Sequence, residues 1–298
     1  MTAKILIAGG VSFDTVIHLP VFPEPRQATL FARESYQAVG ATSSGKALNL
    51  AALGHDVTLA AQLGPDTSGD LLRERFRLAG VSLYELPDIQ TEQHTNLMNA
   101  EGERISIFAV QRTFDPPVSV TNFDRWVGQA EVVVLDIINW SRQLIPLVRA
   151  SGKPIWCDLH DYNGENPYHR DYLEAADYVF LSAQALPDPE RFSADLIAQG
   201  KQLVVMTRGV EGAVALSAKG EQFAVESVTA FGMRDTNGAG DAFMAGYLHG
   251  HVQGQGVGAC LELASLTAAL CVASRELVHQ DLSSEYIQEL YVRFVDSI

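Results

Sequence analysis

The sequence is poor in several features that would each point to a particular class of protein. It has three cysteines in 298 residues, none in a CxxC pair, and no His cluster at zinc spacing (Cys157, Cys260, Cys271). We expect buried, reduced thiols, no metal centre and a cytoplasmic protein. No apolar run approaches the ~20 residues that cross a membrane. The opening MTAKILIAGG is too short an apolar run for a signal peptide.

Positive charge is also scarce. The chain has 21 Lys and Arg against 36 Asp and Glu, which gives a formal net charge of -15. Such a surface repels phosphate backbones and anionic lipids, so we expect neither nucleic acid nor a membrane as a partner. A small anionic ligand remains compatible, because a local group of backbone N–H donors can outweigh distant charges.

Short apolar runs alternate with helix-like stretches along most of the chain. The runs are apolar on both faces, as buried parallel strands are, and they occupy residues 4–10, 56–64, 130–138, 153–160, 177–182 and 202–209. Amphipathic stretches that stop at a glycine lie between several of them. The alternation predicts an α/β fold for residues 1–298 as a single domain, with a doubly wound, mostly parallel sheet flanked by helices.

Two regions do not fit the parallel core. Residues 15–39 hold strand-like runs separated by prolines, and residues 93–111 have the pattern of a hairpin that turns at AEGE, residues 100–103. Alternating polar and apolar residues are typical of half-exposed strands. We expect these strands to pair with one another as a small β-sheet beside the main domain.

Residues 40–47, GATSSGKA, are one residue short of a phosphate-binding P-loop. Gly40, Gly45 and Lys46 fit that motif, but Ala47 stands where a Ser or Thr hydroxyl would hold magnesium. The preceding FARESYQAV is polar at alternate positions, whereas a P-loop follows a buried strand. We therefore interpret the segment as a loop that leads into a helix ending at Gly54.

Residues 234–250, RDTNGAGDAFMAGYLHG, offer a better place for a phosphate. Gly238, Ala239 and Gly240 are small and open an apolar helix, so an anion can approach the free N–H groups of its first turn. Asp241 would repel that anion unless it removes a proton from the attacking group. The combination is typical of phosphoryl transfer. The alternative is a first-turn Asp that only favours the helix dipole.

Residues 235–246 match D-T-x-G-A-G-D followed by A-F-x-A-G, and this pattern resembles the signature of the ribokinase-like, or PfkB, carbohydrate kinases. The resemblance covers the whole chain. It implies that Asp241 is the catalytic base, that Gly238, Ala239 and Gly240 bind the transferring phosphate, and that ATP with Mg²⁺ is the donor. It implies nucleotide contacts at a T-x-G-x-x-G turn and at the start of the signature (Thr207, Gly209, Gly212, Asp235, Asn237). The small sheet would be a lid over the substrate and the contact of a homodimer.

The resemblance also assigns the acceptor side. GGVSFDTV resembles the family's first strand, and the loop at residue 40 resembles G-G-x-x-x-N before a helix ending in L-G. The implied acceptor contacts are Asp14, Gly40, Ala41, Ser44 and Gly45. Ala41 replaces the second glycine and Gly45 the asparagine, so Ser43, Ser44 or Lys46 would have to replace the lost contact. We expect Lys46 beside the acceptor pocket or in solvent. Four further side chains are candidates for substrate contact (Asp158, Arg112, His18, His94).

Other positions depart from the family pattern. The family's N-x-x-E is replaced by residues 182–185, SAQA, and CVASRELVHQD lacks the glycine of the potassium loop. The resemblance therefore does not support activation by a monovalent cation. It implies a kinase that phosphorylates a hydroxyl of a sugar or sugar derivative. One alternative is a nucleoside kinase, because GATSSG also resembles the G-G-A-T-x-N loop of adenosine kinases. The other is a catalytically weak binding protein, which the intact DTNGAGD argues against.

Overall fold

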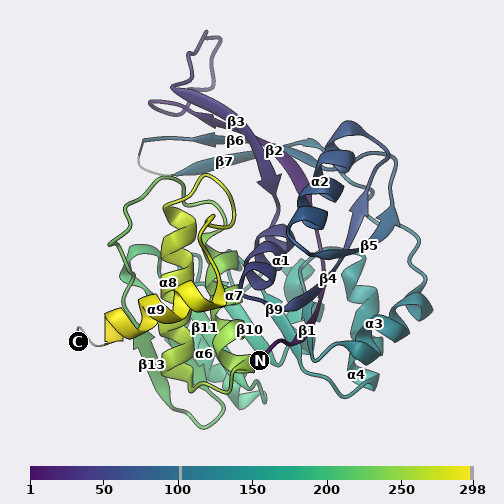
Figure 1. Ribbon diagram of the computed structural model, residues 1–298, viewed down its shortest axis with the longest axis vertical. Helices are drawn as coiled ribbons and strands as arrows, with labels where there is room; N and C mark the ends of the chain where they lie inside the picture. Colours follow the sequence, from purple (N-terminus) through teal and green to yellow (C-terminus); the bar gives the residue numbers. More distant parts are fainter. Residues whose placement is uncertain (101–102, 296–298) are drawn as a thin grey trace.

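The body of the molecule is one large sheet covered by helices on both faces. A computed structural model describes residues 1–100 and 103–295 (Figure 1). The sheet has nine strands in the order β13-β12-β11-β10-β9-β8-β1-β4-β5. These are β1 (Lys4–Ala8), β4 (Asp56–Leu63), β5 (Ser82–Pro87), β8 (Val132–Leu135), β9 (Ile155–Asp158), β10 (Tyr178–Ser182), β11 (Leu203–Thr207), β12 (Ala213–Ser217) and β13 (Gln222–Val225).

Strand direction confirms the predicted fold class. Every pairing from β11 across to β5 is parallel, and only β12 and β13 at one edge run antiparallel to their neighbours. The central strands are buried along their whole length, as in VVVL of β8 and IWCD of β9, because helices cover both faces. The carboxyl ends of β8 and β9 therefore lie side by side at the edge where ligands of open α/β sheets bind.

The helices divide into two layers. One layer packs on a core that includes Ile5, Val57 and Val134 and consists of α1 (Thr42–Ala52), α2 (Thr67–Leu78), α7 (Ala239–Val252) and α8 (Val257–Val272). The other packs around Leu6 and Val133 and consists of α3 (Asp124–Gln129), α4 (Ile145–Ala150), α5 (Arg170–Ala175) and α6 (Pro189–Ala198). Helix α9 (Ser284–Val295) packs against α8 through a third apolar cluster.

Helices α7 and α8 are the most deeply placed. Residues 241–250 of α7 are all buried, and the helix is apolar around most of its circumference, which is typical of a helix inside a core. Gly246 allows the close approach of α8, because a Cβ there would come within 2.8 Å of the Leu263 carbonyl oxygen. The close packing of α7 on α8 sets the position of α7 relative to the sheet.

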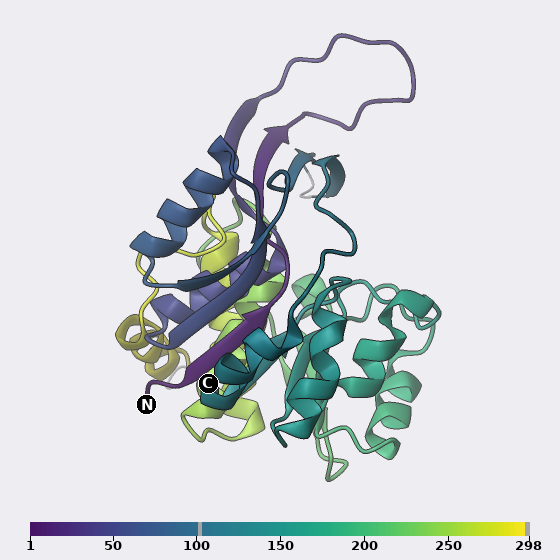
Figure 2. The same ribbon diagram turned by 90° about the vertical axis from the view of Figure 1, so that its right-hand side faces the viewer.

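The two predicted lid regions form a separate four-stranded sheet in the order β3-β2-β6-β7. Its strands are β2 (Ser12–His18), β3 (Glu34–Gly40), β6 (Gln93–Met98) and β7 (Arg104–Val110). Figures 1 and 2 show this sheet above the body, with residues 19–33 extending furthest from it. β2 begins at Ser12, so Asp14 lies within a lid strand and not before it. Of the predicted AEGE turn, residues 101–102 lie outside the described residues.

Two further expectations concern the class of protein. Cys157, Cys260 and Cys271 are all buried and unpaired, as the sequence predicts. Within the described ranges, we find no helix with both the length and the apolar character needed to span a membrane. Short 3₁₀ helices also connect elements of the body (Val120–Phe123, Ser141–Leu144, Pro167–His169, Gly209–Glu211).

Candidate active site

Asp14 is a buried carboxylate on the inner face of the lid. It is 3% exposed and accepts hydrogen bonds from the Asn96 side-chain amide at 2.9 Å and from the His94 backbone N–H at 3.3 Å. Gly40 lies beneath it, and a Cβ at Gly40 would come within 2.1 Å of Asp14 Oδ2. The glycine is therefore required because the carboxylate occupies the space that a side chain would take.

A chain of charged groups continues from Asp14. His94 Nδ1 lies 3.4 Å from Asp14 Oδ2, His94 Nε2 lies 2.9 Å from Glu92 Oε1, and Arg112 donates to the same Glu92 oxygen at 2.9 Å. Burial alone would lower the pKa of His94, but its hydrogen bonds to Asp14 and Glu92 outweigh burial and raise that pKa to about 9. His94 is thus an imidazolium at neutral pH, and the two cations balance the two carboxylates.

The predicted phosphate loop, residues 235–240 before and at the start of α7, has a geometry that suits anion binding. Gly238 precedes α7 with φ 79°, a left-handed conformation that favours glycine, and no side chain caps the helix. The space beside Gly240 is open, because a Cβ there would meet no atom within 4 Å. The Ala239 N–H donates to the Thr236 carbonyl oxygen at 3.3 Å, whereas the Gly240 N–H has no backbone partner among the described residues and keeps its hydrogen-bonding capacity for a ligand.

Asp241 stands in that first turn and is ion-paired to Lys46. The Lys46 ammonium donates to Asp241 Oδ1 at 2.7 Å and lies 3.2 Å from Asp136 Oδ1 and 3.3 Å from Asp158 Oδ2. Asp136 follows β8 and Asp158 ends β9, so the two adjacent strands deliver these carboxylates to one point. Lys46 is 1% exposed. A position in solvent, one of the two expected for Lys46, is therefore wrong.

The surroundings set the charge state of this cluster. Burial raises the pKa of Asp241 to about 6; the Lys46 ammonium opposes that rise and the Asp158 carboxylate adds to it. Burial would also raise the pKa of Asp158, but His160 and Lys46 outweigh it and hold that pKa well below its usual range. Three carboxylates hold the pKa of Lys46 well above normal against the effect of burial. Lys46 is thus a permanent cation, and Asp241 titrates just below neutral pH.

Helix α1 passes so close to Asp241 that Gly45 has no room for a side chain. A Cβ at Gly45 would come within 2.8 Å of Asp241 Cβ and 3.0 Å of its Oδ2. The asparagine of the family motif does not fit at this position in the present arrangement. Ser44 is fully buried, and its hydroxyl has no hydrogen-bond partner among the described residues, whereas Ser43 donates to Asp136. Neither of these two positions presents an exposed side chain.

Ala41 has a backbone conformation typical of glycine, the residue that it replaces in the family motif. It precedes α1 with φ 65° and ψ 153°, a region that glycine occupies readily and other residues seldom do. Such a conformation costs about 1–3 kcal/mol and persists only where the surroundings enforce it. The turn between β3 and α1 is therefore retained although its residue has changed.

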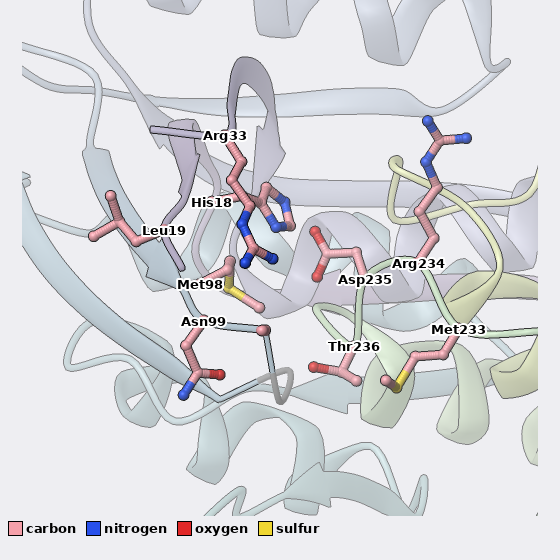
Figure 3. A pocket seen from close by; sticks show the side chains of 10 residues that line it. His18, Leu19, Arg33, Met98, Asn99, Met233, Arg234, Asp235 and Thr236 are labelled. Atoms are coloured by element: carbon pink, nitrogen blue, oxygen red, sulfur yellow. The ribbon is translucent and has the colours of Figure 1, made fainter. Parts of the chain in front are cut away.

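Two lid strands contact the loop that leads into α7. The Tyr36 hydroxyl of β3 donates to Asp235 Oδ2 at 2.8 Å, and Arg104 of β7 donates to the side-chain oxygen of Asn237. The Asn237 backbone N–H donates to Asp235 Oδ1 at 2.8 Å. A cavity of about 170 Å³ remains beside these contacts, lined by lid residues such as His18 and by residues 233–236 (Figure 3). The lid and the phosphate loop are thus joined directly.

The T-x-G-x-x-G turn lies at the carboxyl end of β11. Gly209 has φ 58° and Gly212 has φ 91°, and a Cβ at Gly212 would come within 2.0 Å of the Val225 carbonyl oxygen. The glycines are therefore required by the turn itself. Thr207 pairs with Ser182 at the end of β10, where the family's N-x-x-E is missing. A nucleotide contact here stays a prediction.

Several residues of the site were not anticipated. Tyr36, Arg104, Asn96 and Glu92 belong to no motif, and their contacts join residues far apart in the sequence: Tyr36 and Arg104 reach the loop before α7, Asn96 reaches Asp14, and Glu92 reaches Arg112. The signal for Asp136 was available, because it follows an apolar strand at the sheet edge where ligands bind. Chemically, the assembled site offers a buried carboxyl, Asp241, with a pKa of about 6 beside the uncapped start of α7.

Known proteins resemble this chain over nearly its whole length. The acarbose 7(IV)-phosphotransferase of Actinoplanes sp. is 30% identical over 274 residues, which cover 89% of this chain and 90% of that protein. The cytidine kinase of Thermococcus kodakarensis is 23% identical, over 87% of this chain and 92% of its own. The solved structure of a microbiome-derived acarbose kinase has a TM-score of 0.88 and 28% identity, and the match covers 98% of this chain and 100% of that one.

A family model described as pfkB family carbohydrate kinase matches residues 35–282, a range that contains the cluster around Lys46 and the phosphate loop. The signature around Asp241, the large sheet with its separate lid, and these matches all agree. The enzyme is accordingly a phosphotransferase that acts on a hydroxyl group of a sugar or sugar derivative. The chain belongs to the pfkB family of carbohydrate kinases.

Proposed function

We propose that Asp241 is the general base of this kinase and that the N-terminus of α7 holds the transferring phosphoryl group. The observation that carries the proposal is the juxtaposition of a carboxyl whose pKa is about 6 with uncapped N–H groups and the open space at Gly240. These features fit a phosphate group. When bound, ATP would supply the phosphoryl group, and its Mg²⁺ would offset the negative charge of the phosphate oxygens.

The residues around the base have distinct parts in this scheme. Lys46 occupies Oδ1 of Asp241, so Oδ2 is left to accept the proton of the acceptor hydroxyl. The first-turn N–H of Gly240 donates to the negative charge that develops in the transition state, with Gly238 and Ala239 beside it. We propose nucleotide contacts at Thr207, Gly209, Gly212, Asp235 and Asn237. The Tyr36 and Arg104 contacts hold the lid over the loop and exclude water, which would compete as acceptor.

The acceptor side favours a polyhydroxylated ring. Asp14 and its charged neighbours offer hydrogen-bonding groups that are already positioned. The backbone at Gly40 lies close to the Asp14 carboxylate, and Ala41 follows it. We propose a primary alcohol of a sugar or cyclitol as the group phosphorylated. A nucleoside is the second candidate, because the rings of His94 and Phe108 lie 4.1 Å apart and Phe108 is 51% exposed, which offers a surface for a base.

A screen for ADP release over sugars, aminated sugars, polyols and nucleosides tests the acceptor class. We expect turnover with one of the polyhydroxylated acceptors and little with nucleosides. Turnover confined to a nucleoside would reverse that choice. ATP binding without turnover on any acceptor would favour the weak binding protein instead.

Asp241→Asn tests the base. The amide oxygen of Asn can still accept from Lys46, so the cluster should stay folded while the proton acceptor is lost. We expect kcat to fall by about 100-fold or more with little change in acceptor KM, because proton removal matters only in the transition state. Asp161→Asn at an exposed position is the control and should retain activity. Near-normal kcat in Asp241→Asn would refute the assignment.

Lys46→Met tests the ion pair through the pH dependence of the reaction. Asp241 must be ionised to act, so kcat/KM should rise with pH through a value of about 6 in the parent enzyme. Removing the ammonium at 2.7 Å raises the pKa of Asp241. The rising limb of the plot of kcat/KM against pH should therefore move to higher pH by roughly 1–3 units.

The control is Lys201→Met, a buried lysine that donates to the Glu174 carbonyl oxygen. Circular dichroism checks that both variants are folded, because breaking a buried pair costs about 3–5 kcal/mol. A Lys46→Met enzyme with reduced activity but an unshifted limb would show that Lys46 has only a structural role.

We propose a cytoplasmic homodimer that forms through the outer face of the lid, and the three buried, reduced cysteines support the location. Ile105 and Ile107 pair with Leu97 and Thr95 on the face opposite Asn96, and both isoleucines are more than 40% exposed. An apolar β-surface of this kind is typical of an interface.

Ile107→Lys tests the dimer. Light scattering of the parent protein at micromolar concentration should give twice the monomer mass of 32.4 kDa, and the variant should give the monomer mass. Val292→Lys introduces the same charge at a similarly exposed position on α9 and should remain dimeric. A monomeric parent protein would exclude the proposal.

A further inference from the structure

A second and larger cavity lies behind the loop that follows α8. It has a volume of about 600 Å³, is open to solvent on one side, and is lined by that loop, residues 273–282, together with α1 and α2. Figure 1 shows the loop in yellow beside α1. The floor of the cavity is apolar (Leu48, Ala52, Ala79, Val278, Leu282). A floor of this kind favours the body of an organic molecule over a bare inorganic ion.

The rim of the cavity is basic. Arg75 of α2, Arg234 and Arg275 line it together with His279, and Glu276 is the one acidic residue among the lining. Three arginines around one cavity stand out in a chain of net charge -15. Because guanidinium groups bind phosphate in a bidentate manner, the rim suits a phosphorylated ligand.

These arginines are only partly neutralised. Arg75 lies 3.6 Å from Glu276, and Arg234 forms no ion pair with any residue in the described ranges. Arg275 is paired with Glu34 of β3, and its guanidinium lies 5.6 Å from the centre of the Tyr36 ring. An anion in the cavity would therefore meet Arg234 without displacing an ion-pair partner and would compete with Glu34 for Arg275.

The wall of the cavity is also a wall of the active site. Glu276 and Val278 line the cavity, while Leu277 between them packs towards the phosphate loop, where a Cβ at Gly238 would come within 2.7 Å of it. The backbone N–H groups of Arg234 and Asp235 both donate to the Val272 carbonyl oxygen, at 2.8 and 3.1 Å. A ligand that moves Arg234 or this loop would therefore also shift Gly238 and the lid.

We propose that this cavity is an effector site for a phosphorylated organic anion, distinct from the site of phosphoryl transfer. The phosphate binds the arginine rim and the apolar part of the ligand lies on the floor. Competition for Arg275 frees Glu34 and loosens the lid, so the occupied enzyme holds its acceptor less tightly. By linkage, the acceptor lowers the affinity of the effector by the same factor.

Phenyl phosphate is a minimal probe of this class, and calorimetry with Mg²⁺ and a non-hydrolysable ATP analogue at saturation keeps the nucleotide site filled. We expect saturable binding to the parent enzyme, and weaker binding of inorganic phosphate, which has no apolar part. Arg75→Glu should weaken binding of phenyl phosphate at least tenfold. Arg77→Glu makes the same charge change on the same helix outside the cavity and should bind as the parent does.

Ala79→Leu fills the floor without a change of charge and should also weaken binding, which guards against a global effect of charge reversal. In kinetic assays, phenyl phosphate should raise the acceptor KM of the parent enzyme and of Arg77→Glu but not of Arg75→Glu. Absence of saturable binding to the parent, or equal affinity in Arg75→Glu and Arg77→Glu, would overturn the site. Binding with an unchanged acceptor KM would overturn its role as an effector site.

Discussion

The ion cluster around Lys46 is the constraint on which the rest of the site depends. A single ammonium, buried completely, joins carboxylates from the ends of β8 and β9 to the first turn of α7. Three buried aspartates without it would repel one another and could not all remain ionised. Burial raises the pKa of Asp241 to about 6, and Lys46 fixes the position of Asp241 while opposing that rise.

Close approach of backbone to side chain is the second feature that shapes the site. Gly40 leaves room for Asp14, and Gly45 leaves room for Asp241. In both cases a glycine on or beside α1 gives the space to a carboxylate from another element. The departure from the family motif at Gly45 is thus linked to the presence of Lys46 one residue later, because α1 lies directly against α7 at this point.

Contacts between the lid and the loop that leads into α7 join two parts of the molecule that are distant in the sequence. Tyr36 and Arg104 reach Asp235 and Asn237 from opposite edges of the lid sheet. The Asp14 network lies on the same inner face, through Asn96 and Ser106. A change in the position of this face is therefore passed directly to residues 235–237 at the start of α7. The loop after α8 takes part as well, because Arg275 holds Glu34 of the lid.

The order of strands and helices was readable from the sequence because buried parallel strands are continuous apolar runs and the helices between them end at glycines. The edge strands β5, β12 and β13 were not predicted, since their partly exposed residues carry a weaker pattern. The glycine turn and the helix that begins beside Asp241 were also readable, because a small-residue turn at a helix N-terminus is a local arrangement. The surroundings of Lys46 could not be predicted from the sequence, because its three partners lie 90, 112 and 195 residues away along the chain. Local residue order thus determined the elements and the phosphate loop. Only tertiary packing decided that Lys46 is buried with three carboxylates, because long-range ion pairs arise from the meeting of strand ends and helix starts that no local pattern records.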